Sequence, residues 1–408
     1  MFTRAQRHRF LEVSKQATRW YYMNQNTDKQ PWGGMKNSSD QGRFVYEYYP
    51  AKDQGRAAGV WAQALGIMAL GAANLGGKDL NWWERDDSIK LAAKYMCRLQ
   101  VNRPDKPASH GGFCEHTPGD MHSYPRDAAT GGIGLAVLHH ITKEDKFIDM
   151  AKDFCHWYRD YGSAKDGWPH ITYDLEKGEG INANIEPGLE SNDTSFIRGD
   201  WQAGGGLAYY YLGCISGERK YIDDYFLPLI DQLVILFEKF PYTEPDYGFH
   251  GSVPVSFGND DFALVALLCA YVCTKDKKYY EIAKGRIDDF EKYWDEESGS
   301  FPSFGGTFTS GITLKVIMDI EEKFELCAPS EKYEDMIKRI AEHGLGIQAF
   351  DYNNVRVHGG FWGQTEYGVS KDRIHHRSTG YASIFYSMLG SKELIPYYHA
   401  LGWDVPEK

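Results

Sequence analysis

The chain has 408 residues and a formal net charge of −12, and 42% of its residues are hydrophobic. This apolar share supports a folded core, whereas an acidic balance without a Lys- or Arg-rich stripe argues against a nucleic-acid-binding protein. The seven cysteines are odd in number, lie mostly in apolar stretches and lack CysxxCys spacing, so we expect free thiols, no metal site and no cofactor.

The N-terminal segment gives no sign of export or of membrane insertion. Residues 1–10 carry several basic side chains and no apolar run, so no signal peptide is visible. No stretch of the chain stays apolar over the ~20 residues that a transmembrane helix needs. We expect no membrane or nucleic-acid partner, and a protein that is cytoplasmic or, if a signal has been removed, periplasmic or secreted.

A helical hairpin recurs along the chain at intervals of roughly 50–75 residues, a spacing that is typical of repeat architectures. Each hairpin has an apolar helix rich in small residues, a short charged turn and an amphipathic helix. The pairs are Ala57–Leu75 with Asp86–Leu99, Gly132–Leu138 with Phe147–Tyr158, Leu207–Gly213 with Tyr221–Phe237, Phe262–Val272 with Tyr279–Trp294, Ile312–Phe324 with Tyr333–His343, and Gly380–Leu389 with Lys392–Leu401.

The two helices of a pair differ in the surface they can bury. The first nearly lacks charge and should be buried all round, whereas the second carries one apolar stripe, such as Phe147, Met150, Ala151 and Phe154. Buried inner helices within a ring of amphipathic outer helices define an all-α (α/α) toroid of about six to seven hairpins. We predict one such domain over residues 1–408, closed by an N-terminal helix and Tyr-rich loop in residues 1–54. An open solenoid is the alternative, although solenoids usually have shorter and more uniform loops.

The loops that enter the inner helices hold the candidate functional residues, because in a toroid these loops form a bowl at one end. The first loop, residues 110–127, contains Glu115, His122, Tyr124, Arg126 and Asp127. It begins with HisGlyGlyPhe, which recurs at residues 358–361, so we interpret this turn as structural. An irregular Gly-rich loop with these side chains favours a functional role over a plain surface loop.

The second and third loops carry further candidates. Arg198, Asp200 and Trp201 precede a run of three glycines that leaves room for a bulky ligand, and Trp201 suits a sugar platform. Arg198 and Asp200 also fit a structural ion pair. Tyr247 and His250 lie three residues apart in the third loop and are candidates for proton transfer.

The fourth loop combines aromatic and cationic side chains. Trp362 and Tyr367 lie next to a cluster from Lys371 to Arg377 that includes His376. Arg and His side chains bind carboxylate or sulfate, so this cluster fits an anion site. A solvated charged turn is the alternative.

Three segments resemble landmarks of the toroidal unsaturated-uronyl hydrolases. They are residues 168–174 (Trp-Pro-His-Ile-Thr-Tyr-Asp), residues 196–201 (Phe-Ile-Arg-Gly-Asp-Trp) and residues 378–386. The resemblance implies a catalytic aspartate before an earlier inner helix, a place that Asp127 occupies. The Tyr, His and Arg content of the loops also resembles the toroidal lyases that cut uronate polysaccharides, and the resemblance covers roughly residues 120–215 and 375–390.

We predict a polysaccharide lyase that cleaves an acidic polymer of the alginate or glucuronan type by β-elimination. Arg198 or Arg377 would neutralise the uronate carboxylate, and a Tyr or His would transfer the protons. The catalytic candidates are Tyr124, His122, Tyr247, His250, Arg198 and Asp127, and the substrate-binding candidates are Glu115, Arg126, Asp200, Trp201, Trp362, Tyr367, His376 and Arg377. The alternatives are an unsaturated-uronyl glycoside hydrolase using Asp127 and Asp200, a sugar epimerase, and a non-catalytic carbohydrate-binding toroid. The expected partner is an acidic oligo- or polysaccharide, and the sequence does not predict an oligomeric state.

Overall fold

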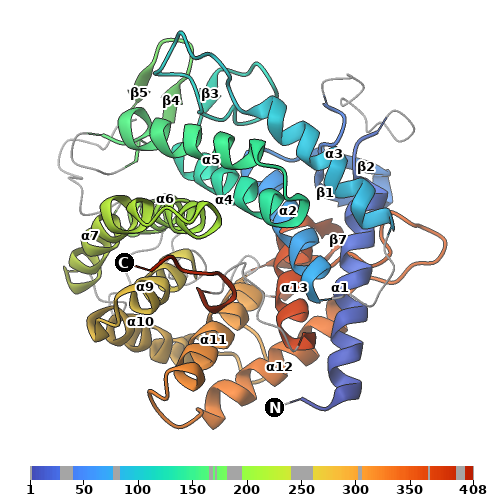
Figure 1. Ribbon diagram of the computed structural model, residues 1–408. Coiled ribbons are helices and arrows are strands. Elements are labelled where there is room, and N and C mark those ends of the chain that lie inside the picture. The colour runs from blue at the N-terminus through green and yellow to red at the C-terminus, as the bar shows by residue number, and fades with distance from the viewer. Residues whose placement is uncertain are drawn as a thin grey trace.

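The computed structural model describes residues 2–27, 40–76, 83–164, 169–170, 172–181, 195–239, 261–301, 306–365, 368–391 and 400–407. Figure 1 shows its helices arranged in a ring. The inner helices are α2 (Val60–Gly76), α4 (Pro125–Thr142), α6 (Ser195–Ser216), α9 (Asp261–Thr274), α11 (Gly306–Lys323) and α13 (His376–Gly390). Each packs on the next, and α13 packs on α2, so the ring is closed. The predicted (α/α) toroid is therefore confirmed.

The outer helices lie where the amphipathic segments predict them. They are α3 (Trp83–Leu99), α5 (Lys146–Trp157), α7 (Leu227–Lys239), α10 (Lys277–Asp288) and α12 (Glu331–Ile347), and a π-helical segment at Tyr221–Phe226 runs directly into α7. In α5 the predicted stripe buries Phe147, Ala151 and Phe154 against the inner ring. The inner helices are buried nearly all round, as in the run from Ala128 to Leu138 of α4.

Helix α1 (Arg4–Asn24) takes the outer position beside α13. A capping box starts it, because the side chain of Thr3 accepts the Gln6 backbone N–H and the Gln6 side chain accepts the Thr3 backbone N–H. The sequence analysis instead predicts Lys392–Leu401 as the outer helix that pairs with the last inner helix. Most of that segment lies outside the described residues, and the outer position is filled from the other end of the chain.

Two small antiparallel sheets lie at the end of the ring where the inner helices begin. One has the strand order β2-β1-β7-β6, formed by β1 (Val45–Tyr49), β2 (Gln54–Ala57), β6 (Trp362–Thr365) and β7 (Gly368–His375). The other has the order β3-β4-β5, formed by β3 (His122–Ser123), β4 (Thr172–Asp174) and β5 (Glu179–Ile181). Strands β2, β3 and β7 lead straight into α2, α4 and α13. Parts of the loops that the sequence predicts as irregular therefore form short strands. The predicted all-α class does not include these strands.

One turn is built three times between an outer helix and the following inner helix. A glutamine just after the outer helix donates from Nε2 to two backbone carbonyls, one of the turn's glycine and one of the neighbouring outer helix. The sets are Gln25 with Gly42 and Ser88, Gln100 with Gly111 and Met150, and Gln348 with Gly359 and Val13. The three glycines have φ between +86° and +89°, and a Cβ there would lie 2.0–2.2 Å from a carbonyl oxygen of the neighbouring outer helix. A buried phenylalanine follows each turn, at Phe44, Phe113 and Phe361.

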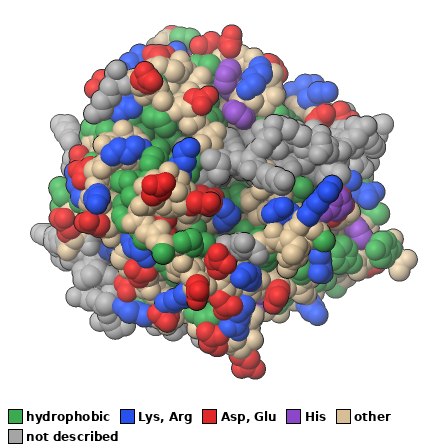
Figure 2. Space-filling view, turned by 60° about the horizontal axis from the view of Figure 1, so that its bottom comes forward, with side chains coloured by type: hydrophobic (Ala, Val, Ile, Leu, Met, Phe, Trp, Pro, Cys, Tyr) green, Lys and Arg blue, Asp and Glu red, His purple; other side chains and the backbone are tan. Residues whose placement is uncertain are grey.

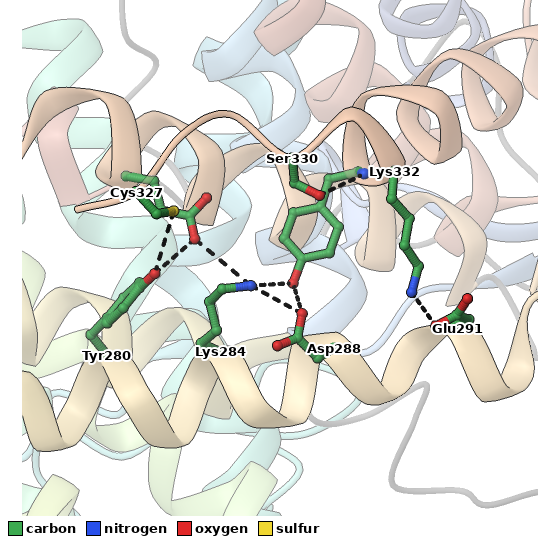
Figure 3. Close-up of polar contacts among 9 residues, drawn as sticks. Tyr280, Lys284, Asp288, Glu291, Cys327, Ser330 and Lys332 are labelled. Carbon is green, nitrogen blue, oxygen red and sulfur yellow. Dashed lines mark hydrogen bonds and ion pairs between the residues drawn. The ribbon is translucent and has the colours of Figure 1, made fainter. Parts of the chain in front are cut away.

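A polar network joins α10, α11 and α12 on the outer side of the ring (Figure 3). The Tyr280 hydroxyl donates to Glu321 at 2.8 Å, and Lys284 Nζ donates to Asp288 and to the Tyr333 hydroxyl at 3.0 Å each. Burial and Asp288 both raise the pKa of Tyr333 above its ordinary value. The network therefore fixes the spacing of three helices, and every group that we name in it has a partner.

The C-terminal segment crosses the other end of the ring, where it lies against α9 and α11 (Figure 1). The indole of Trp403 stacks on Tyr211 with ring centroids 5.1 Å apart and meets His140 edge-on at the same distance. Arg219 donates to the Pro406 carbonyl oxygen at 2.9 Å. On the face shown in Figure 2, acidic and basic side chains are interspersed rather than gathered by sign. None of the described helices has the length and hydropathy of a membrane span.

Candidate functional site

The candidate site lies in the bowl where α2, α4 and α13 begin. Trp61 is the second residue of α2, Asp127 the third of α4 and Arg377 the second of α13. These three helices are neighbours in the ring. Helix N-termini carry partial positive charge from unpaired N–H groups, so a bowl built from them favours negative charge on a bound molecule.

The repeated turn at residues 110–113 holds Glu115 at the floor of the bowl. The Glu115 backbone N–H donates to the His122 carbonyl oxygen, and the Glu115 carbonyl oxygen accepts from the Val60 N–H, both at 2.8 Å. The Glu115 side chain passes against Gly59, where an added Cβ would lie 2.7 Å from Oε1. Only 4% of Glu115 is exposed, so its carboxyl is almost completely removed from solvent.

Glu115 and Asp127 form a hydrogen-bonded carboxyl pair. Burial raises the pKa of Glu115 well above its usual value, and the Asp127 charge raises this pKa further, while the Tyr124 backbone N–H acts against the shift. Two close carboxyls cannot both ionise cheaply, so the more buried one keeps the proton. Asp127 is the more accessible member, since its side chain is 24% exposed and lies 3.8 Å from Arg126. The pair therefore combines a buried Glu115 carboxyl, whose pKa is raised, with the more accessible carboxyl of Asp127.

Tyr46 of β1 lies over the start of α2, close enough to both Asp127 and Arg377 to interact with their charges. Its ring centroid is 6.3 Å from that of Trp61 and 5.0 Å from that of His375. Burial raises the pKa of the Tyr46 phenol despite the opposing Arg377 charge. The half-buried Tyr46 and Trp61 thus add two aromatic walls to the bowl.

Sequence reasoning missed both of these aromatic residues. A signal for Tyr46 exists, because Tyr46 follows Phe44 by two residues just as Glu115 follows Phe113 by two residues. The three-fold repeat of the turn equates these positions. The copy at residues 40–44 reads Asp-Gln-Gly-Arg-Phe and lacks the histidine and second glycine that make the other two copies recognisable.

The cluster from Lys371 to Arg377 is divided between two environments. Arg373 and His375 lie 3.4 Å and 3.6 Å from the buried Glu47 carboxylate. His376 is fully buried, its Nδ1 lies 3.2 Å from the Val45 carbonyl oxygen, and burial lowers its pKa to about 3. Three members of the cluster thus lie at Glu47 or in the interior, whereas Arg377 is close enough to Tyr46 for its charge to act on the phenol. The anion site stays a prediction.

Other predicted residues fall into three groups. His122 and Tyr124 meet edge-on with centroids 4.7 Å apart, and together with Glu115, Arg126 and Asp127 they surround the start of α4. Trp362 is half-buried in β6. The first turns of α6, next to α4, contain Arg198, Asp200 and Trp201, whose side chains are not described. Three further predicted residues lie outside the described part of the chain: Tyr247, His250 and Tyr367. The roles of all these residues stay predictions.

Within the described part of the chain, no group of three or more His, Cys, Asp or Glu side chains is arranged to hold a metal ion. The carboxyl pair, the rings of Tyr46 and Trp61, and Arg377 gather around the first turns of α2, α4 and α13. Carboxyl groups and a cation placed together in this way are groups that can take part in proton transfer.

The closed ring with its loop bowl places the chain among the (α/α) toroids, and comparison with solved structures supports this fold. A sugar epimerase from a ruminal bacterium aligns with a TM-score of 0.67 at 12% identity, covering 94% of this chain and 98% of that one. A cellobiose 2-epimerase from Spirochaeta thermophila aligns with 0.63 at 13% identity, covering 94% and 97%. A GH76 α-mannanase from Bacteroides thetaiotaomicron aligns with 0.62 at 13% identity, covering 93% and 95%.

No protein-family model matches the chain, and no curated protein matches it in sequence. At these identities the structural alignments establish the fold alone. The three proteins are named as epimerases and a glycoside hydrolase, so the resemblance to uronate lyases remains a prediction.

Proposed function

We propose that the protein is a carbohydrate-active enzyme that moves a proton on a sugar, as an epimerase or isomerase does. The observation that carries this proposal is the close pair of Glu115 and Asp127 in the bowl, in which burial and the Asp127 charge raise the pKa of Glu115. An ionised carboxylate with an adjacent proton reservoir is suited to removing a proton from carbon and returning it.

The direct contact between the two carboxyls argues against their use as the two catalytic acids of a glycosidase. Glycosidase carboxyls generally lie about 5–10 Å apart, so that a sugar carbon, or a sugar and a water molecule, fits between them. A hydrogen-bonded pair leaves no such space. The pair is therefore better suited to act as one unit, with Asp127 as the group that touches the sugar and Glu115 as its support.

In the proposed reaction an open-chain aldose binds with its carbonyl oxygen toward Arg377 and the helix N-termini. Asp127 removes the proton from C2, and the electron pair moves onto the carbonyl oxygen to give an enediolate. Positive charge from Arg377 stabilises this oxyanion. Asp127 then returns a proton to C1 while the O2 hydroxyl proton passes to O1, which gives the ketose. Return of the proton to C2 gives the epimer when the enediolate has turned its opposite face toward Asp127, so in either outcome one proton leaves C2 and one is returned to the sugar from the carboxyl.

Two findings support this reaction over the lyase that the sequence favours. The proteins of similar fold include epimerases that match this chain over nearly its whole length. In the predicted cationic cluster, His376 is buried with a lowered pKa, and Arg373 and His375 lie at the Glu47 carboxylate, so this cluster offers a uronate polymer fewer cations than the sequence predicts.

A glycoside hydrolase is the second candidate, and the similarity to a GH76 α-mannanase favours it. In that case Asp127 of α4 would work with Asp200 of α6, since the two helices are neighbours. This pairing keeps the alternative that the sequence left open.

One panel of substrates separates these reactions. The protein is incubated with cellobiose, mannobiose, α-mannan and alginate, and products are followed by NMR, by reducing ends and by absorbance near ~235 nm. We expect a C2 epimer or a ketose from a disaccharide, with loss of turnover in Asp127→Asn and little change in the matched control Asp149→Asn, an exposed aspartate of α5. New reducing ends would support the hydrolase, and a rise in absorbance would support the lyase; either result would overturn the proposal.

A further inference from the structure

The turn between α12 and α13 is a second copy of the turn between α3 and α4, and the two have the same length. Eleven positions separate Gln100 from Gly111 and Gln348 from Gly359. The same backbone hydrogen bonds recur: Gly111 donates to Val101 and Gly359 to Ala349, at 2.9 Å and 2.8 Å. In each copy a buried indole, Trp157 or Trp20, donates to the carbonyl oxygen three residues before the positive-φ glycine.

The two copies differ sharply in what they expose. Residues 102, 104 and 107 of the first copy are Asn, Pro and Pro, and the corresponding residues of the second are Phe350, Tyr352 and Val355. The exposed fractions of these three side chains are 54%, 86% and 52%. Since the first copy makes the same turn without them, the turn itself does not require exposed aromatic residues.

The aromatic side chains are held in place. The His358 ring lies 4.8 Å from the Tyr352 ring and 5.4 Å from the Phe350 ring, measured between centroids. Asp351 Oδ1 accepts the backbone N–H groups of Asn353 and Asn354 at 2.8 Å and 3.2 Å, which fixes the turn around Tyr352. A rigid aromatic platform loses little entropy when it binds a ligand.

A cavity of about 210 Å³ lies beside this platform and offers both apolar and polar contacts. Its lining residues are Arg19, Met23, Asp351, Tyr352, Val355 and His358. This volume is below the ~300 Å³ lower limit of typical pockets for drug-sized ligands, so it fits about one ring. Aromatic and aliphatic walls with a guanidinium and a carboxyl at the edge match a pyranose, whose C–H face is apolar and whose rim carries hydroxyls.

A protein partner fits these observations less well. Among the described residues the only other large exposed hydrophobic side chain is Ile235, which lies in α7. Stable protein interfaces bury on the order of 1,000 Å² or more, and three side chains around a small cavity do not supply that area.

The turn is also attached to the strand that enters the bowl. Asn354 Nδ2 donates to the Tyr48 hydroxyl at 3.1 Å, and Tyr48 lies two residues after Tyr46 in β1. Arg356 lies 3.8 Å from Asp53, which follows the same strand. The platform is therefore joined to β1, the strand that also carries Tyr46.

We propose that the cavity between Tyr352 and His358 is a second saccharide-binding site, which takes one neutral pyranose ring of an oligosaccharide. The choice of a sugar as ligand rests on the proposed function. The neutral ring is favoured because the edge of the cavity carries one cation and one carboxylate.

Calorimetric titration with cellotriose and mannotriose tests this proposal. The proteins compared are wild type, Phe350→Asn, Tyr352→Ala and a control, Ile235→Ala, which removes another exposed hydrophobic side chain elsewhere. We expect at least one trisaccharide to bind the wild type and the control alike. Tyr352→Ala should weaken that binding on the order of tenfold, about 1.4 kcal/mol, without lowering the melting temperature.

Three outcomes would overturn the proposal: no binding of either sugar to the wild type, equal binding to Tyr352→Ala, or a dimer of the wild type that Tyr352→Ala abolishes. The last would make the patch an interface between copies of the chain. The test is independent of catalysis, because Asp127→Asn should keep this second site. If the wild type binds the sugar at this second site but shows no turnover of any substrate, the proposed function is contradicted while the binding site is supported.

Discussion

Glu115 shows how burial decides the chemistry of a single residue. In water its carboxyl would ionise with the ordinary glutamate pKa, but burial and the nearby Asp127 charge raise this pKa. A protonated Glu115 carboxyl can donate a hydrogen bond to Asp127, whose side chain remains partly accessible, and this interaction offsets part of the cost of burial. Gly59 is part of the arrangement, since any Cβ at that position would displace the Glu115 carboxyl.

The raised pKa of Glu115 predicts a pH-dependent stability. Above the ordinary glutamate pKa the unfolded chain has released this proton while the folded chain keeps it, so stability falls as pH rises through the folded-state pKa. Glu115→Gln is neutral at every pH and still donates to Asp127. We expect the melting temperature of Glu115→Gln, relative to wild type, to increase from pH 5 to pH 8 in thermal scans. A difference that is constant over this range would contradict the raised pKa.

His376 predicts the opposite trend at acid pH. Burial lowers the pKa of His376 to about 3. Below about pH 6.5, therefore, this histidine binds a proton in the unfolded chain but stays neutral in the folded chain. Stability contributed by this neutral histidine is lost as pH falls from 6.5 toward 3. In His376→Phe the urea midpoint should fall less between pH 7 and pH 4 than in wild type or in the exposed-site control His8→Gln. An equal fall in all three proteins would show that His376 is protonated in the folded state.

The helices of the ring could be predicted from sequence because each has its own periodic signal. The stripe of Phe147, Ala151 and Phe154 identifies α5, and the uncharged run of α4 identifies an inner helix. The outer partner of α13 could not be predicted in this way. Helix α1 lies more than 350 residues away in sequence, and local patterns do not show which distant helix closes a ring.

The candidate site could be predicted only in part, because sequence spacing does not report burial. Glu115 and Asp127 were identified from their loop, but their hydrogen bond depends on a turn that folds residue 115 back onto α4. His376 looked cationic in sequence and is a buried neutral ring. Tyr46 required recognition of the third copy of the turn, whose sequence has diverged at two of its key positions.

The repeated turn predicts opposite effects for two glycine substitutions close together in the chain. Gly359 has φ +86°, and a Cβ there would lie 2.2 Å from the Gln16 carbonyl oxygen of α1, so Gly359→Ala should cost at least about 2 kcal/mol. Gly346 is an exposed glycine of α12 with no atom near its missing Cβ, so Gly346→Ala should add about 0.5–1 kcal/mol. Denaturant unfolding measures both changes, and a stable Gly359→Ala would mean that α1 does not close the ring.

Across the whole molecule, the two ends of the chain close the ring in different ways. The N-terminal helix fills the outer layer beside α13, while the C-terminal segment covers the end of the ring opposite the bowl. Asp127 and His140 lie near opposite ends of α4, thirteen residues apart, which corresponds to about 20 Å along a helix. Stability and chemistry are thus located at different ends of the same inner helices.

This separation predicts that loss of the Trp403 indole affects stability and spares the chemistry. Trp403 is 6% exposed and stacks on Tyr211, so Trp403→Ala should destabilise the fold by about 3 kcal/mol or more. Turnover at a temperature well below unfolding should match wild type. A normal melting temperature would contradict the stabilising role of the Trp403 indole. A folded but inactive variant would contradict the separation of stability from chemistry.

The most direct test of the central claim is solvent deuterium incorporation into a disaccharide incubated with the protein in D2O, read by NMR. If Asp127 removes the C2 proton with support from Glu115, deuterium appears at C2 of an epimer or at C1 of a ketose, in the wild type and in the exposed-site control Asp149→Asn. Incorporation should fall by about 10²-fold or more in Asp127→Asn. Product formation without deuterium at either carbon, or equal incorporation in Asp127→Asn, would contradict proton transfer by this carboxyl pair.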